Sequence, residues 1–190
     1  LAVARHLLAG GDRSLLDVRV PFHPGTGAPE PLLAHLDRAL ELIARRRVKG
    51  TALAAYGHGD WNDALQPADP SLREDMCSAW TVTLHHQTLT SLARALRHAG
   101  LEKRAAALDA EAATVKEAFR AKLMPDGVVA GYAHFAPGAP PRYLLHPRDG
   151  ETGVLVPSDN AQALTDGLEQ LMRDPGKAEE MGRCGRARAV

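Results

Sequence analysis

Residues 78–100 read "SAWTVTLHHQTLTSLARALRHAG", a long stretch whose only glycine is its last residue and which contains no proline. Upstream, Ser71-Leu72-Arg73-Glu74 matches a capping box, in which the serine hydroxyl and the glutamate carboxylate each satisfy a backbone N–H at a helix start. Gly100 is suited to the left-handed conformation that ends many helices. The pattern therefore predicts a long helix that begins near Ser71 and ends at Gly100.

The flanking segments predict further helices. Residues 31–47 carry an apolar stripe at helical spacing, and residues 101–123 are alanine-rich, as expected of a third helix. Pro125-Asp126-Gly127 predicts a sharp turn, and residues 128–135 a short strand or an extended crossing. Successive helices with short connections predict a mainly α fold, although spacing alone leaves a bundle and a helical toroid both open.

Composition limits the functional classes. Lys+Arg and Asp+Glu are both 23, which argues against nucleic acid and against an acidic membrane surface as partners. No apolar run approaches the roughly 20 residues that cross a bilayer. Cys77 and Cys184 are the only cysteines, and two distant thiols form neither a disulfide framework nor a metal site. We therefore expect a cytoplasmic protein.

After residue 150 the composition changes. "GETGVLVPSDNAQALTDGLEQL" predicts a turn, a short strand at residues 154–156, and a helix over residues 160–173 capped by Ser158 or Asp159. A second helix is expected from Pro175. The chain begins without methionine and stops within a helical pattern, so we expect a fragment of a longer protein.

The polar stretch "YGHGDWNDALQPAD", residues 56–69, is the candidate site. If its centre is helical, Asp60 and Asp63 share a face, with Cβ atoms roughly 5–6 Å apart. A glycoside-processing site needs a carboxylic acid that stays protonated near neutral pH in order to protonate the departing glycosidic oxygen. The indole of Trp61 can exclude water from such an acid, and Asn62 can bond sugar hydroxyls. His58 is a further candidate for a hydroxyl partner.

Simpler interpretations stay open from the pattern alone. The same residues fit a surface turn in which Asp and Asn side chains bond the backbone. A calcium loop is excluded because the later acidic ligands are missing. His85 and His86 point to different helix faces, so we expect a structural histidine and no shared metal.

Four other residues are assigned from their types. His146 and Arg148 are expected either to bind substrate or to anchor a loop. Trp80 is expected in the core, and Cys77 as a small buried side chain.

The segment "GTALAAYGHGDWNDALQPAD" resembles the cellobiose and chitobiose phosphorylase family, which also includes the phosphorylase-like part of cyclic β-1,2-glucan synthases. Its hallmark is a Gly-Asp-Trp-Asn-Asp-Gly run, and residues 59–63 match it while Ala64 replaces the final glycine. The resemblance covers about residues 1–150 and implies a partial (α/α)6 toroid.

The resemblance also implies roles. Asp63 would be the general acid, Trp61 would line a sugar subsite, and Asp60 would organise the loop. Such enzymes invert the anomeric centre with inorganic phosphate as nucleophile, and the resemblance implies no organic cofactor and no metal. The implied partners are a β-linked glucoside, phosphate and, in the full-length parent, further copies of the chain.

Residues 151–190 resemble the C-terminal end of GT-B retaining glycosyltransferases of the GT4 type. Gly150-Glu151-Thr152-Gly153 matches that family's turn, and "MGRCGRAR" matches its ending. We therefore predict two domains, 1–150 and 151–190, with a junction near residues 150–153.

The predicted function is that of a fragment of an inverting β-glucoside phosphorylase, inactive by itself. Two alternatives are a non-catalytic helical carbohydrate-binding remnant and an inverting hydrolase on the same toroid. The hydrolase would need a base carboxylate roughly 6.5–9.5 Å from Asp63, which Asp60 does not readily provide.

Overall fold

The computed structural model describes residues 1–23, 27–57, 69–146 and 153–189, the last four of them by backbone only. Within these ranges the chain forms six α-helices, three short 3-10 turns and five strands of two or three residues. The predicted mainly α class is confirmed, and closure into a toroid stays a prediction. The chain divides into two compact units, Leu1–Ala54 with Thr81–Phe119 and Ala55–Trp80 with Arg120–Val190.

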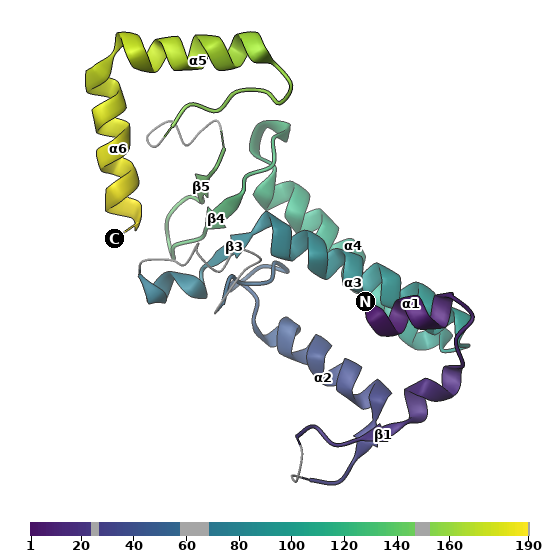
Figure 1. Cartoon of the computed structure of the whole chain (residues 1–190). Coiled ribbons are helices and arrows are strands. Elements are labelled where there is room, and N and C mark those ends of the chain that lie inside the picture. Colours follow the sequence, from purple (N-terminus) through teal and green to yellow (C-terminus); the bar gives the residue numbers. More distant parts are fainter. Residues whose placement is uncertain (24–26, 58–68, 147–152, 190) are drawn as a thin grey trace. The chain divides into compact units, whose positions relative to one another are not determined.

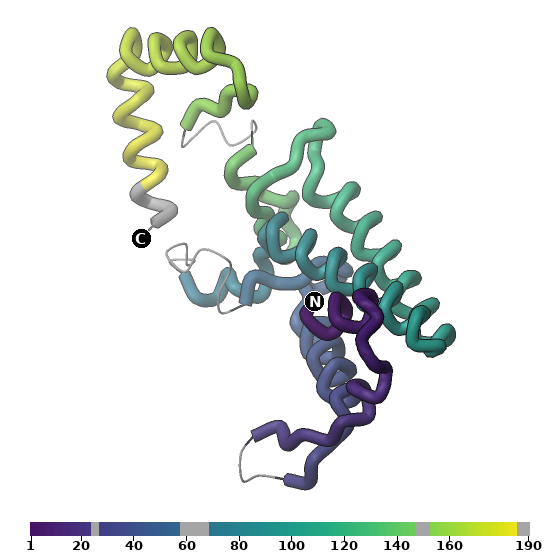
Figure 2. The backbone as a smooth tube through the Cα atoms, turned by 45° about the vertical axis from the view of Figure 1, so that its right-hand side comes forward, coloured from purple at the N-terminus to yellow at the C-terminus, as the bar shows by residue number. Residues whose placement is uncertain are grey.

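The first unit contains most of a helical hairpin. Helix α3 (Ala79–His98) and helix α4 (Glu102–Leu123) lie side by side in both views (Figures 1 and 2). Gly100 has φ +78°, and the Leu101 N–H donates to Leu96 O at 2.8 Å, which closes the turn as predicted. The buried apolar residues of the hairpin in this unit are Val82, Leu89, Leu92, Ala93, Ala95, Leu96, Ala105, Leu108, Ala112 and Val115.

Helix α2 (Leu32–Arg45) confirms the helix predicted over residues 31–47. It lacks a fully buried residue, because its apolar stripe is covered only in part. Two ion pairs connect this segment to α4: Arg104 with Asp37 at 2.6 Å, and Arg47 with Glu111.

The N-terminal elements of this unit were not predicted. They comprise α1 (Ala2–Leu8), the 3-10 turn η1 (Arg13–Asp17), and the strands β1 (Arg19–Val20) and β2 (Glu30–Pro31), which pair antiparallel. Strands of two residues carry too little periodicity to be recognised from sequence.

The second unit contains a small antiparallel sheet in the order β3-β4-β5. Strand β4 (Tyr132–His134) lies between β3 (Met76–Ser78) and β5 (Arg142–Leu144). The strand expected within residues 128–135 is therefore confirmed as β4. The predicted turn is also confirmed as η3 (Pro125–Gly127), in which Asp126 and Gly127 both have positive φ.

The predicted capping box at Ser71 is wrong. Asp69 is the N-cap, and its carboxylate accepts from the Ser71 N–H at 2.8 Å. The turn that follows is the 3-10 helix η2 (Pro70–Arg73), after which the chain enters β3, so α3 begins only at Ala79. The prediction of a helix start at Ser71 failed because β3 pairs with a strand more than fifty residues later, and no local pattern carries that information.

The C-terminal helices are α5 (Ala161–Arg173) and α6 (Pro175–Ala189), as predicted. The N-cap of α5 was predicted wrongly. The Asn160 side chain, and neither Ser158 nor Asp159, accepts from the Ala163 N–H at 2.9 Å. The strand predicted at residues 154–156 is irregular backbone. It contacts α5 at Gly167, where a Cβ atom would lie 3.2 Å from Val156 Cγ1.

Candidate active site

The predicted site residues His58, Asp60, Trp61, Asn62 and Asp63 all lie within residues 58–68, outside the described part of the chain. Their roles therefore stay predictions. The chain on both sides of this segment is described, and it defines the frame to which the segment is attached.

The residues just before the segment are fixed by backbone hydrogen bonds. The Tyr56 N–H donates to Met76 O at 2.7 Å, and the Gly57 N–H donates to Arg73 O at 2.9 Å. Gly57 has φ +64°, a left-handed conformation that a side chain makes unfavourable. Glycine at this position thus lets the chain turn away from β3.

The residue just after the segment is fixed as well. The Asp69 carboxylate caps η2, and its hydrogen bonds from the Ser71 hydroxyl and the Ser71 backbone N–H lower its pKa. Because Gly57 bonds Arg73 at the other end of η2, both ends of the segment are attached to this one 3-10 turn.

Beneath this attachment lies a small apolar cluster formed by Tyr56, Met76 and Tyr132, with the half-buried Leu144 against it. The two tyrosine rings are 6.0 Å apart between centroids and tilted by 49°, a separation typical of favourable aromatic pairs. The cluster draws one residue from the chain before the segment and three from the β3-β4-β5 sheet. The sheet therefore supports Tyr56, two residues before the candidate segment.

His146, expected either to bind substrate or to anchor a loop, has the contacts of an anchor. It is 1% exposed, its Nε2–H donates to Pro125 O at 3.1 Å, and its ring lies 5.7 Å from that of Tyr143. Arg148 lies outside the described residues.

The two remaining assignments have opposite outcomes. Cys77 is fully buried as predicted, and burial raises the pKa of its thiol to about 12, so it stays protonated and unreactive near neutral pH. Trp80 was predicted in the core, but it is 54% exposed in the first turn of α3, so that prediction is wrong.

His85 is buried, as expected of a structural histidine, but it is not satisfied. Neither ring nitrogen has a hydrogen-bond partner in the described part of the chain, and Glu111 Oε1 lies 3.9 Å from Nε2. Burial lowers the pKa of His85. Among the described residues, no three His, Cys, Asp or Glu side chains come together as a metal site would require.

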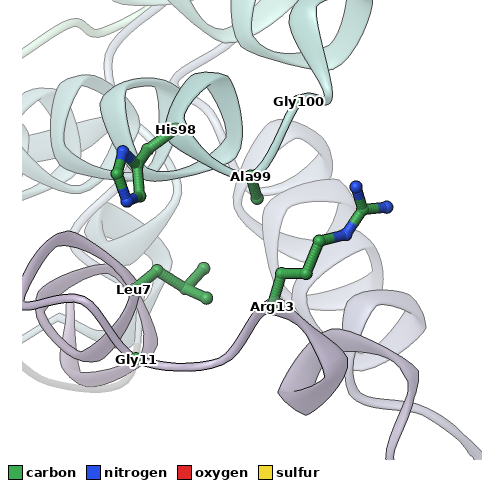
Figure 3. A pocket seen from close by; sticks show the side chains of 6 residues that line it. All are labelled: Leu7, Gly11, Arg13, His98, Ala99 and Gly100. Carbon is green, nitrogen blue, oxygen red and sulfur yellow. The ribbon is translucent and has the colours of Figure 1, made fainter.

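A surface hollow of about 390 Å³ lies in the first unit, lined by Leu7, Gly11, Arg13, His98, Ala99 and Gly100 (Figure 3). The Arg13 guanidinium and the His98 ring point away from each other, so they do not converge on a shared ligand. The hollow contains none of the predicted site residues.

Comparison with known proteins confirms both resemblances, to a glycoside phosphorylase and to a glycosyltransferase. A 1,2-beta-oligoglucan phosphorylase of Listeria innocua serovar 6a is 35% identical over 158 residues, which is 80% of this chain and 14% of that protein. A GDP-mannose-dependent alpha-(1-6)-phosphatidylinositol monomannoside mannosyltransferase of Mycolicibacterium smegmatis is 32% identical over 158 residues, 80% of this chain and 38% of that protein. No protein-family model matches the chain.

The extents of these matches bear on the domain division. Each match includes 80% of the chain, so the two must overlap through much of it. The similarity to the mannosyltransferase is therefore not confined to residues 151–190, and the boundary at residue 150 stays a prediction. None of the helices in the described ranges is both long and apolar enough to cross a membrane.

Proposed function

We propose that this chain is part of an inverting phosphorylase that splits β-1,2-linked oligoglucans with inorganic phosphate and releases a sugar 1-phosphate. The observation that carries the proposal is the Gly-Asp-Trp-Asn-Asp run at residues 59–63 within a chain 35% identical to a 1,2-beta-oligoglucan phosphorylase. The second relative transfers a sugar as well, which is consistent with a role in carbohydrate metabolism.

In the proposed reaction Asp63 protonates the departing glycosidic oxygen while phosphate attacks the anomeric carbon from the opposite face. One carboxylic acid suffices because phosphate is itself the nucleophile, so no second carboxylate has to activate water. Trp61 keeps water from the acid and offers an apolar face to a sugar ring. Asp60 organises the loop, and Asn62 and His58 bond sugar hydroxyls.

The described frame is consistent with this role. A proton donor must be held within hydrogen-bond reach of the oxygen that it protonates. The segment that carries Asp63 is attached at Gly57 and at Asp69 to the same 3-10 turn, and the residue before Gly57, Tyr56, belongs to the Tyr56–Met76–Tyr132 cluster. Attachment at both ends limits the positions that the loop can reach.

The chain corresponds to only 14% of the Listeria phosphorylase, so we expect little or no phosphorolysis from it alone. The test is a chimera in which the matched segment of the Listeria enzyme is replaced by this chain's residues. The chimera should release sugar 1-phosphate from a β-1,2-glucan in the presence of phosphate, and Asp63→Asn should abolish the release. Asp69→Asn is the matched control, because asparagine can also cap η2 and activity should persist.

The other outcomes identify the alternatives. Full phosphorolysis by the Asp63→Asn chimera would show that Asp63 is a turn residue and not the general acid. Release of free glucose without phosphate would indicate a hydrolase. Oligoglucan binding by the 190-residue chain, titrated through tryptophan fluorescence and combined with an inactive chimera, would favour a binding remnant.

A further inference from the structure

Three side chains from three different elements form what we call the His85 cluster: His85 on α3, Glu111 on α4, and Arg47 just after α2. The Nη2 of Arg47 donates to Oε1 of Glu111, and the Nε2 of His85 lies 3.9 Å from that same oxygen. The His85 residue is 5% exposed, whereas the side chains of Arg47 and Glu111 are 24% and 28% exposed. All three belong to the first compact unit.

The cluster contains polar atoms that bond nothing in the described part of the chain. Both ring nitrogens of His85 and the Nε of Arg47 are buried without a hydrogen-bond partner. A neutral imidazole has one donor and one acceptor, and a protonated imidazole has two donors. Buried polar groups without partners are rare because their lost hydration is not compensated, so this arrangement calls for an explanation.

The charged groups around His85 act in opposite directions. Burial is the largest influence and lowers its pKa, the Glu111 carboxylate raises it, and Arg47 and the neighbouring His86 lower it. Neutral His85 is therefore the form present near neutral pH. On protonation His85 can donate to Glu111 Oε1, 3.9 Å from Nε2, which a small side-chain adjustment brings into hydrogen-bond range.

We propose that His85 is a proton-operated switch on the Arg47–Glu111 ion pair. While His85 is neutral, it does not compete for the Glu111 carboxylate, which stays paired with Arg47. Protonated His85 donates to Glu111 and weakens the Arg47–Glu111 ion pair, because the two cations then share one carboxylate oxygen.

The element that responds is the turn after α2. Arg47 pairs with Ala54 in an isolated antiparallel bridge, and the Val48 N–H donates to Leu53 O at 2.9 Å. Release of the Arg47 side chain therefore loosens the turn over residues 47–54. Gly57, three residues further along the chain, is the last described residue before the candidate loop. The switch does not depend on the proposed function. Only an effect of the switch on catalysis would depend on it.

The test is an NMR titration of the 15N-labelled chain from about pH 8 to about pH 5, which spans the ordinary range of histidine. It follows the His85 ring nitrogens and the Arg47 Nε–Hε signal. We expect His85 to titrate below its ordinary value of 6.5 and the Arg47 signal to shift with the same midpoint. In His85→Gln the Arg47 shift should vanish, whereas His86→Gln, its neighbour on another helix face, should keep it.

Two further variants test the sign of each interaction. Glu111→Gln should lower the His85 midpoint because it removes the negative charge, and Arg47→Gln should raise it because it removes the positive charge. An Arg47 signal that does not follow His85, or a His85 midpoint at or above 6.5, overturns the proposal. If the variants fail to fold, the wild-type titration alone decides, and none of these readouts requires enzymatic activity.

Discussion

For individual side chains, burial determines chemistry more than residue type does. Cys77 and His85 are both nucleophiles in other settings, yet burial keeps the thiol protonated and the imidazole neutral near neutral pH. His146 is equally buried but bonds a carbonyl oxygen, so it acts as an anchor. Sequence alone identifies the titratable groups, and the direction of each shift follows only from the surroundings.

His85 should make the protein sensitive to acid. Its folded-state pKa lies below the unfolded value of 6.5, so the unfolded chain takes up the proton first. The stability tied to neutral His85 is complete above the unfolded pKa and is lost as the pH falls below it. Urea unfolding at several pH values should show the free energy of unfolding decreasing more steeply below pH 6.5 in the wild type than in His85→Gln. Equal slopes in the two proteins would contradict the assignment.

Gly131 is constrained by a close approach to Leu145. A Cβ atom at Gly131 would lie 2.9 Å from Cβ and Cδ1 of Leu145, which itself has φ +53°. Gly131→Ala should therefore lower the free energy of unfolding by about 1–3 kcal/mol, as overpacking usually does. Leu145→Gly removes both the clash and the left-handed strain, so Gly131→Ala should cost much less in that background. Equal costs in both backgrounds, measured by urea unfolding, would disprove the contact.

Among the elements, those with local signals were predictable. The end of α3 just before Gly100, the span of α4 and the start of α6 at Pro175 agree with the sequence because glycine and proline act through their own backbone. The start of α3 was misplaced because residues 76–78 pair with residues 132–134. The exposure of Trp80 was missed for a similar reason, since what covers a helix face is set by distant residues.

The N-cap of α5 offers a direct test at the level of an element. Asn160 accepts from the Ala163 N–H, so Asn160→Ala should destabilise the C-terminal helix pair by about 0.5–2 kcal/mol. Hydrogen exchange at the first turn of α5 should become faster in that variant. Ser158→Ala replaces one of the two caps proposed from the sequence, and it should leave exchange in this turn unchanged. Faster exchange in Ser158→Ala than in Asn160→Ala would contradict the assignment of Asn160 and support Ser158 as the N-cap.

For the chain as a whole, the candidate site and its frame are known from different sources. The motif at residues 59–63 was recognised from its resemblance to a phosphorylase family, and the attachment at Gly57, Asp69 and the Tyr56 cluster came only from the structure. That attachment depends on pairing between segments far apart in sequence, which local patterns do not encode.

The exposed apolar row on α5 predicts how the isolated chain behaves in solution. Leu164, Leu168 and Met172 follow one another at four-residue spacing and are 53%, 54% and 80% exposed. Such a row buries its surface when two molecules associate, so we expect self-association that increases with concentration in sedimentation velocity. Leu168→Glu places a charge in the row and should shift the chain toward monomer. Gln170→Glu adds the same charge on another face of α5 and should leave association unchanged, so equal effects of the two variants would show that net charge, and not the apolar row, drives association.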